Sequence, residues 1–230
     1  MPDQALRRVR SFVRREGRMT AAQKDALEEL WPRYGLDWPA AAPLDLTALF
    51  GREAPRVLEI GFGNGETFAA QVAANPGQDF LGIEVYRTGV AKLLRAAALA
   101  EARNLRVLCA DATEVIASLA PASLDRVQIY FPDPWPKKRH HKRRLVQAGF
   151  AGQLARVLKP GGRLLLATDW RDYAEQMLAV LNAHAGFANL AADARCVPRP
   201  PERPLTRFEQ RGIKLGHEVF DLAFRRVDRA

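Results

Sequence analysis

The sequence predicts a doubly wound α/β fold, in which helices cover both faces of a mostly parallel β-sheet. Two observations carry this prediction. From Arg56 onward, short apolar runs typical of buried strands alternate with longer segments of helical composition. A glycine-rich loop, residues 61–65, follows the first of these runs. Ligands of such sheets bind beyond the carboxyl ends of the strands, so we expect the functional site there.

The first 45 residues look like an extension that precedes the main domain, residues 46–230. A basic arm leads to Thr20, a good helix N-cap, and residues 21–31 have helical composition. Pro32 and Gly35 are expected to end this helix, and residues 39–43 read as a linker. The arm is either a solvated surface or a nucleic-acid contact. Its arginines are Arg7, Arg8, Arg10, Arg14, Arg15 and Arg18, against only Asp3 and Glu16.

The main domain then reads in order as alternating strands and helices. Five strands are expected at residues 57–60, 80–83, 105–109, 124–131 and 163–168. Helices are expected from about residue 67, at 87–102, at 112–119, at 145–158 and at 173–185. Four prolines then indicate an extended loop: Pro198, Pro200, Pro201 and Pro204. Residues 218–224 read as a last strand at or near an edge of the sheet.

Composition bounds the function as well. A hydrophobic content of 48% is ample for a packed core, and the formal charge of +9 favours a polyanionic partner. The only cysteines, Cys109 and Cys196, form no C-x-x-C pair, so neither a disulfide framework nor a metal site is indicated. The sequence has no apolar run long enough for a membrane span and no signal-peptide core. We therefore expect a cytoplasmic protein, monomer or homodimer, with no membrane or metal partner.

The glycine loop argues for a particular cofactor. Gly61, Gly63 and Gly65 let the backbone turn tightly, but a dinucleotide fingerprint needs its third glycine at position 66, where this chain has Glu66. No Gly-Lys-Ser/Thr follows, which excludes a Walker loop. A carboxylate at the helix entrance is also unfavourable for a pyrophosphate. The loop therefore suits a cofactor with cationic and hydroxyl groups, such as S-adenosylmethionine.

Three acids stand at the ends of three consecutive predicted strands. Glu59 is placed for the amino-acid part of S-adenosylmethionine, directly or through water. Glu84 is placed for the ribose hydroxyls, and Asp111 for the adenine amino group. Each acid taken singly is better explained as a helix cap or turn residue. Their coincidence at one edge of the sheet favours a cofactor site.

The segment 131–144 points to chemistry on nucleic acid. Asp133-Pro134-Trp135 follows the fourth strand, and the surrounding prolines stiffen the loop that presents these side chains. Trp135 is either a surface for stacking a base or a core anchor, and Asp133 is either catalytic or part of a structural ion pair. Residues 137–144 hold six Lys or Arg and no acid, which favours contacts with phosphates. His140 and His141 lack metal-ligand spacing and belong to the same basic surface.

These motifs resemble the bacterial tRNA (guanine-N7-)-methyltransferase family. The resemblance rests on residues 59–65, 82–84, 111–112, 131–144, 168–169 and 206–209, and on the N-terminal segments 10–19 and 31–35. It covers nearly the whole chain in order, and the Pro-Asp-Pro-Trp-Pro-Lys run is its most specific part. The resemblance implies a Rossmann-like class I methyltransferase fold. It also implies that S-adenosylmethionine methylates N7 of the variable-loop guanine in tRNA.

The resemblance implies roles for individual residues too. Glu59, Glu84, Asp111 and Asp133 match the cofactor-site acids, and Asp133 is also the expected catalytic residue. Substrate-contacting positions match Lys137, Asp169, Thr206, Arg207, Phe208 and Glu209. The RNA-interacting segment matches Arg139, His140, His141, Lys142, Arg143 and Arg144. Three rivals stay open: a methyltransferase of another RNA or a small molecule, a non-catalytic RNA-binding protein on the same scaffold, and a dinucleotide-dependent oxidoreductase, which the glycine spacing disfavours.

Overall fold

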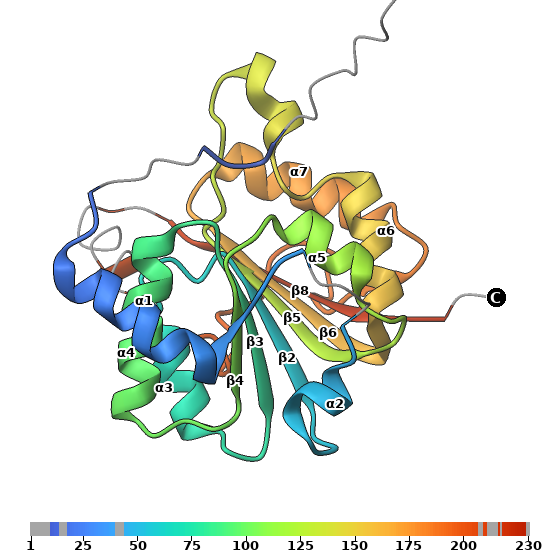
Figure 1. The fold of residues 1–230 in the computed structure, drawn as a ribbon. Helices are drawn as coiled ribbons and strands as arrows, with labels where there is room; N and C mark the ends of the chain where they lie inside the picture. The colour runs from blue at the N-terminus through green and yellow to red at the C-terminus, as the bar shows by residue number, and fades with distance from the viewer. Residues whose placement is uncertain are drawn as a thin grey trace, which may run out of the picture.

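A computed structural model describes residues 10–13, 18–39, 44–206, 209–210, 216 and 218–228. Eight strands form one sheet in the order β1-β4-β3-β2-β5-β6-β8-β7 (Figure 1). The strands are β1 Gly35–Leu36, β2 Arg56–Ile60, β3 Asp79–Ile83, β4 Leu105–Leu108, β5 Leu124–Tyr130, β6 Leu158–Thr168, β7 Phe187–Asn189 and β8 Phe220–Arg226. The helices are α1 Ala21–Tyr34, α2 Leu46–Phe50, α3 Glu66–Ala74, α4 Arg87–Leu99, α5 Ala112–Ser118, α6 Ala148–Val157 and α7 Arg171–Asn182, with a 3₁₀ turn η1 at Lys138–Arg143.

The topology places a switch point in the middle of the sheet. Strands β1 to β6 are parallel, whereas β8 runs antiparallel between β6 and β7. From β2 the chain proceeds to β3 and β4 on one side, and then crosses to β5 on the other side of β2. Loops that leave β2 and β5 therefore diverge, which opens a crevice at their carboxyl ends. The predicted mostly parallel, doubly wound α/β fold is confirmed.

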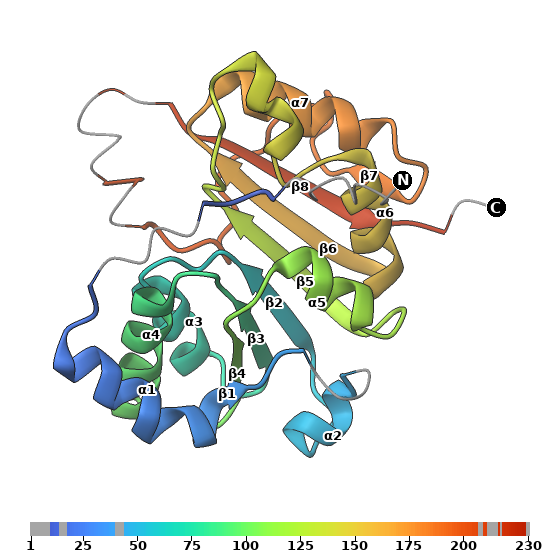
Figure 2. The same ribbon diagram turned by 45° about the horizontal axis from the view of Figure 1, so that its top comes forward.

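Helices cover the two faces of the sheet unequally (Figures 1 and 2). On one face α5, α6 and α7 bury a continuous apolar layer that includes Leu58, Val127, Ile129 and Leu166. On the other face α1, α3 and α4 cover only β2, β3 and β4, over residues such as Phe80. The remainder of that face carries a small apolar cluster that includes Leu165, Ala167 and Ala223. Beside it lie polar side chains from β2, β5, β6 and β8: Glu59, Arg126, Gln128, Tyr130, Arg163 and Asp221. An extended segment around Arg203 contacts this polar part instead of a helix.

The N-terminal helix follows the prediction at its start and departs from it at its end. Thr20 caps α1 with a full capping box, because its side chain accepts from the Gln23 N–H and Gln23 reaches back to the Thr20 N–H. Pro32 does not end the helix. It lies inside the last turn, and the helix stops at Gly35, whose N–H donates to the Trp31 carbonyl.

Two strands were not predicted, and both are short. Gly35–Leu36 pairs in parallel with β4, so the segment that follows α1 joins the sheet edge. Phe187–Asn189 forms the opposite edge beside β8, which is therefore one strand in from the edge. Strands of two and three residues show no usable hydrophobic periodicity. The division of the chain at residue 45 stays a prediction.

Candidate active site

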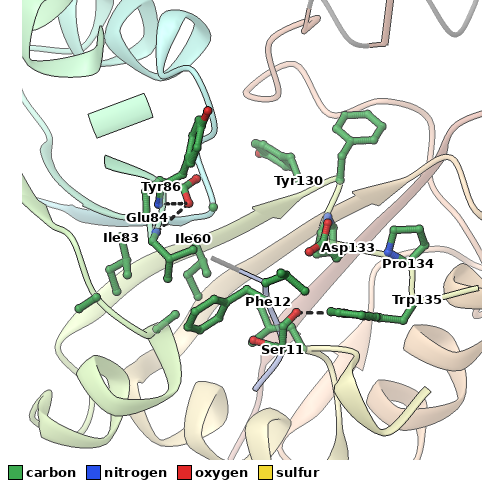
Figure 3. A pocket seen from close by; sticks show the side chains of 18 of the residues that line it. Ser11, Phe12, Ile60, Ile83, Glu84, Tyr86, Tyr130, Asp133, Pro134 and Trp135 are labelled. Carbon is green, nitrogen blue, oxygen red and sulfur yellow. Dashed lines mark hydrogen bonds between the residues drawn. The ribbon is translucent and has the colours of Figure 1, made fainter. Parts of the chain in front are cut away.

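A cavity of about 570 Å³ opens at the carboxyl ends of the central strands (Figure 3). Ile60, Ile83 and Tyr130, the last residues of β2, β3 and β5, all line it. The other lining residues are Ser11, Phe12, Val13, Gly61, Glu84, Val85, Tyr86, Ala110, Ala112, Phe131, Pro132, Asp133, Pro134, Trp135, Pro136 and Leu145. The cavity thus lies at the switch point, where the fold predicts a ligand site. Its volume is within the range of about 300–1,000 Å³ that is usual for cofactor pockets.

The glycine loop forms one wall of this cavity. Gly61, Gly63 and Gly65 all have positive φ, at 75°, 57° and 72°, which side-chain-bearing residues rarely adopt. Helix α3 begins directly after Gly65. Gly89 in α4 is equally constrained, because a Cβ there would lie 2.0 Å from the Gly63 carbonyl oxygen. Of the three loop glycines, Gly61 lines the cavity, and Gly63 and Gly65 shape the turn behind it.

Glu84 is a buried carboxylate that faces the cavity. Its Oε2 accepts from the Gly63 N–H at 2.8 Å, and its Oε1 accepts from the N–H groups of Val85 and Tyr86 at 2.7 and 3.0 Å. Burial raises its pKa, and the negative charge of Asp133 acts in the same direction. Figure 3 shows Glu84 and Asp133 on opposite sides of the cavity. The backbone donors fix the Glu84 oxygens in place, as a hydroxyl-binding carboxylate requires.

Glu59 lies beneath the cavity and does not line it. Its side chain points to the polar face of the sheet, is 5% exposed, and accepts a 2.6 Å hydrogen bond from Gln128 Nε2. Gln128 Nε2 also donates to Gln71 Oε1 at 2.6 Å. Burial raises the pKa of Glu59 to about 7 against the opposing effects of Gln128 and Arg126. The expected contact of Glu59 with the cofactor therefore stays a prediction. What the structure shows is Glu59 in a buried hydrogen-bond network with Gln128 and Gln71.

Asp111 is the N-cap of α5. Its Oδ1 accepts from both the Thr113 N–H at 2.9 Å and the Thr113 hydroxyl at 2.8 Å. The residues on either side, Ala110 and Ala112, line the cavity, whereas Asp111 does not. Asp111 therefore caps α5. Its expected contact with the adenine stays a prediction, since both of its neighbours line the cavity.

The segment after β5 presents Asp133 at the cavity. Phe131 and Trp135 on either side have positive φ, at 52° and 45°. Such backbone geometry in residues other than glycine costs free energy and clusters at functional sites. Asp133 is exposed and lines the cavity wall across from Glu84. The local sequence therefore holds a carboxylate at the wall of the cavity.

Trp135 ties the N-terminal segment to the cavity. Its indole N–H donates to the Ser11 carbonyl at 2.9 Å, as Figure 3 shows, and Phe12 also lines the cavity. Arg143 lies over the Trp135 ring at 4.9 Å, and the rings of His140 and Trp135 form a T-shaped pair with their centroids 5.8 Å apart. Trp135 is thus an anchor that joins the arm, the loop and the basic turn. The sequence offered no signal for this contact, which spans 124 positions.

The basic block separates into an exposed part and one buried arginine. Lys137, Lys138, Arg139 and Lys142 are exposed on η1 and at its start, the yellow turn above α7 in Figure 2. Partial burial and the cations around it lower the pKa of His140. Like-charged groups so close together create a strongly positive surface beside the cavity.

Arg144 requires a correction. The residue is 2% exposed, and its guanidinium donates to the Pro134 carbonyl at 2.8 Å, to Gln176 Oε1 at 2.7 Å, and to Asp172. It also lies over the Tyr173 ring at 4.9 Å. A guanidinium whose donors are used inside the protein cannot also hold a phosphate. Arg144 therefore fixes the Pro134 backbone, and we remove it from the predicted RNA surface.

The predicted substrate contacts are only partly in reach of the cavity. Asp169 follows β6, and Lys137 follows the lining residue Pro136, but neither lines the cavity. Thr206 Oγ1 accepts from the Glu209 N–H at 3.0 Å. Glu209 is 4% exposed and pairs with Arg203, which differs from the expected substrate contact. The predicted contacts Arg207 and Phe208 lie outside the described residues.

Part of the basic arm lies at a second cavity of about 450 Å³ between α1 and α4. Arg18, Lys24 and Arg87 line it, and Tyr86 is shared with the first cavity. Arg10 is exposed. Arg7, Arg8, Arg14 and Arg15 lie outside the described residues.

Some further features bound the chemistry. Cys109 and Cys196 are thiols. Within the parts of the chain that the structure describes, no three His, Cys, Asp or Glu side chains are grouped so that they could hold a metal ion. In the same parts, no helix has both the length and the apolar character needed to cross a membrane.

Known proteins share this fold and much of this sequence. The family model described as "Putative methyltransferase" matches residues 53–222. The tRNA (guanine-N(7)-)-methyltransferases of Nitrosococcus oceani and Alkalilimnicola ehrlichii are each 57% identical to this chain over 96% of its length and over 92% and 93% of theirs. The crystal structure of the 16S rRNA methyltransferase KamB superposes with a TM-score of 0.57 at 19% identity, over 80% of this chain and 93% of that one, which supports the fold. The chain belongs to the tRNA (guanine-N(7)-)-methyltransferase family.

Proposed function

We propose that this chain transfers the methyl group of S-adenosylmethionine to N7 of the variable-loop guanine of tRNA. The observation that carries the proposal is the pair of carboxylates at one cavity, Glu84 held by backbone donors and Asp133 beside the exposed cations of η1. Relatives with 57% identity carry the name of this activity. An enzyme that acts on RNA needs both a reaction centre and a positive surface beside it, and this chain has both.

The cavity residues fit the cofactor chemically. Glu84 would accept hydrogen bonds from the ribose hydroxyls, because its two oxygens are already aligned by N–H donors. Gly61 lets the backbone approach the amino-acid part without a Cβ in the way. Asp111, at the start of α5, would accept a hydrogen bond from the adenine amino group of the cofactor. The Glu59 carboxylate, which lies beneath the cavity, would stabilise the positive charge of the cofactor's ammonium group.

The protein's contribution to the reaction is alignment and electrostatics. S-adenosylmethionine supplies a methyl group on a positively charged sulfur. The N7 lone pair of guanine forms the new bond to the methyl carbon as the carbon–sulfur bond breaks, and the bonding pair stays on sulfur. No proton has to be removed first. Because the purine gains positive charge, the Asp133 carboxylate would stabilise it, which makes Asp133 the proposed catalytic residue.

The exposed cations would hold the tRNA backbone. Lys137, Arg139 and Lys142 would contact phosphates around the reacting base, together with the half-buried Arg143. Asp169 and Thr206 would contact the substrate. Arg18, Lys24 and Arg87 at the second cavity extend this positive surface toward α1. Because the substrate is tRNA, we also propose a cytoplasmic location; the protein would act as a monomer or homodimer.

Labelled methyl transfer tests the function. Unmodified tRNA transcripts are compared with transcripts in which adenine replaces the variable-loop guanine, with labelled S-adenosylmethionine as donor. We expect incorporation only where the guanine is present, with the label recovered as N7-methylguanosine. Equal incorporation into both transcripts would show another base to be the target. No incorporation into either, with intact cofactor binding, would favour a non-catalytic RNA-binding protein.

A further inference from the structure

A buried ion cluster joins the C-terminal segment to the sheet beneath the cavity. Arg203 is 2% exposed, and its guanidinium makes four hydrogen bonds to two carboxylates. Glu209 accepts from Nη1 and Nη2 at 2.6 and 2.7 Å, and Asp221 of β8 accepts from Nη2 at 2.8 Å and from Nε. Both carboxylates are 4% exposed. Two buried carboxylates so close together would repel each other without the arginine between them.

The same guanidinium reaches the wall of the cavity. It lies over the ring of Tyr130 at 5.9 Å and over that of Phe131 at 5.8 Å. Both aromatic residues line the cavity, and both directly precede the loop that presents Asp133. Arg203 thus contacts the residues that set the direction of the catalytic loop.

The neighbours of Arg203 fasten the same segment. Glu202 pairs with Arg163 of β6, and its carbonyl accepts from Gln71 of α3 at 3.0 Å. On the other side, Thr206 caps the turn that carries Glu209. The segment from Glu202 to Glu209 is therefore anchored at both ends to side chains of the polar face.

We infer that Arg203 is a positioning residue of the methyl-transfer site, and that the Glu209 carboxylate acts through Arg203 instead of touching the guanine. This inference rests on the proposed function, since the site that Arg203 positions is the site for tRNA. Its geometry follows from the two bidentate pairs, which fix the guanidinium plane in a way that a lysine ammonium cannot. The plane in turn fixes the Tyr130 and Phe131 rings and the turn at Thr206.

A double-mutant cycle tests the shared role of the two residues. Arg203→Met removes the donors but keeps a long apolar side chain, and Glu209→Gln removes the charge at nearly constant shape. Each single variant is expected to lower kcat/KM for tRNA by about 100-fold, as a misplaced site does. The kcat/KM of the Arg203→Met/Glu209→Gln double variant is expected to be no lower than that of the less active single variant. Losses that multiply in the double variant would mean that Glu209 acts independently, and would overturn the inference.

Further readouts separate positioning from a general loss of structure. The Kd of S-adenosylmethionine should stay within about threefold in each variant, because Glu84 and Gly61 on the far wall are untouched. Arg203→Lys should recover part of the turnover but not the wild-type KM for tRNA. Arg195→Met, at an exposed arginine that precedes the same segment, serves as the control and should match the wild type. A loss of cofactor binding equal to the loss of turnover would assign Arg203 a merely structural role.

Hydrogen exchange without tRNA tests the anchoring apart from the activity. Arg203→Met should speed amide exchange in residues 202–206 and 209–210 and leave the central strands β2 and β5 protected. Unchanged exchange in these residues would overturn the inference whatever the activity. A wild-type protein that does not methylate tRNA would refute the proposed function, and the exchange result would still decide whether Arg203 anchors the segment.

Discussion

Glu59→Gln should make the protein more stable, and by more at neutral pH than in mild acid. Glu59 is 5% exposed, and its pKa is raised from 4.5 to about 7, chiefly by burial. A shift of this size corresponds to about 3 kcal/mol between the two protonation states. Glutamine keeps the side-chain length and can still accept from Gln128, but it carries no charge to desolvate.

The direction follows from proton linkage. Because the folded state has the higher pKa, it holds more protons than the unfolded state between about pH 4.5 and 7. The free energy of unfolding contributed by Glu59 therefore falls as pH rises through this window, by about 1.4 kcal/mol per pH unit at most, and levels off above it. Between about pH 5.5 and 8, the wild type should lose about 2 kcal/mol relative to the variant.

Urea unfolding of both proteins at the two pH values, at constant ionic strength, measures this difference. Other groups also titrate over the same range, but they are common to both proteins and cancel in the comparison. Glu175→Gln on the exposed face of α7 is the matched control and should show no pH-dependent difference from the wild type. If the free energies of unfolding of the wild type and Glu59→Gln differ by the same amount at both pH values, the raised pKa of Glu59 is refuted.

The same variant reports on the cofactor. If the ionised Glu59 acts on the ammonium of S-adenosylmethionine, affinity for the cofactor should rise as pH rises through about 7. Glu59→Gln should lose this part of the pH dependence and bind more weakly at neutral pH. A wild type and a variant with parallel pH profiles would place Glu59 outside the cofactor site. A residue that lowers stability yet serves binding is the expected trade-off at a functional site.

The remaining predictions concern the loop and the basic turn. Asp133→Asn should lower turnover by about 100-fold or more, as loss of transition-state electrostatics does, with cofactor and tRNA Kd values nearly unchanged; full turnover would refute the catalytic role. Trp135→Phe keeps an aromatic ring but loses the donor to Ser11, so cofactor affinity should fall about fivefold in calorimetry, and an unchanged Kd would make that contact irrelevant to the cavity. Arg139→Gln should reduce the slope of log K for tRNA against log salt by about 0.7–0.9, whereas Arg144→Gln should lower the Tm without changing that slope. An equal slope change in both would return Arg144 to the RNA surface.

The sequence predicted which residues lie at the strand ends better than it predicted whether their side chains point into the cavity. In a parallel sheet the end of each strand faces the ligand edge, so Glu84 and Asp133 were correctly expected there. Glu59 is one residue before the end of β2, and strand alternation turns it to the opposite side from Ile60. Asp111 also follows the end of a strand, as expected, but its Oδ1 accepts a hydrogen bond from the Thr113 N–H at the start of α5.

Contacts between distant segments left no trace in the local sequence. Arg144 ends a run of cations and looks like its neighbours, but its partners Asp172 and Gln176 belong to α7, 28 and 32 positions away. The Ser11 carbonyl meets Trp135 across 124 positions. Such pairs depend on the packing of whole elements, which a local pattern does not encode.

Charged side chains on the part of the sheet that Arg203 contacts attach the C-terminal segment to the sheet. Burying a charge costs several kcal/mol unless partners compensate, and apolar side chains of similar volume usually stabilise a core better. The chain uses apolar residues under α3 and α4, as at Phe80, whereas the part of the sheet that faces Arg203 combines a small apolar cluster with charged and polar side chains. Directional ion pairs hold a segment in one arrangement without the area that a helix must bury. The described contacts of this segment with the sheet are ion pairs and hydrogen bonds beside a small apolar cluster, so the segment should open at a lower free energy than β5 or β6.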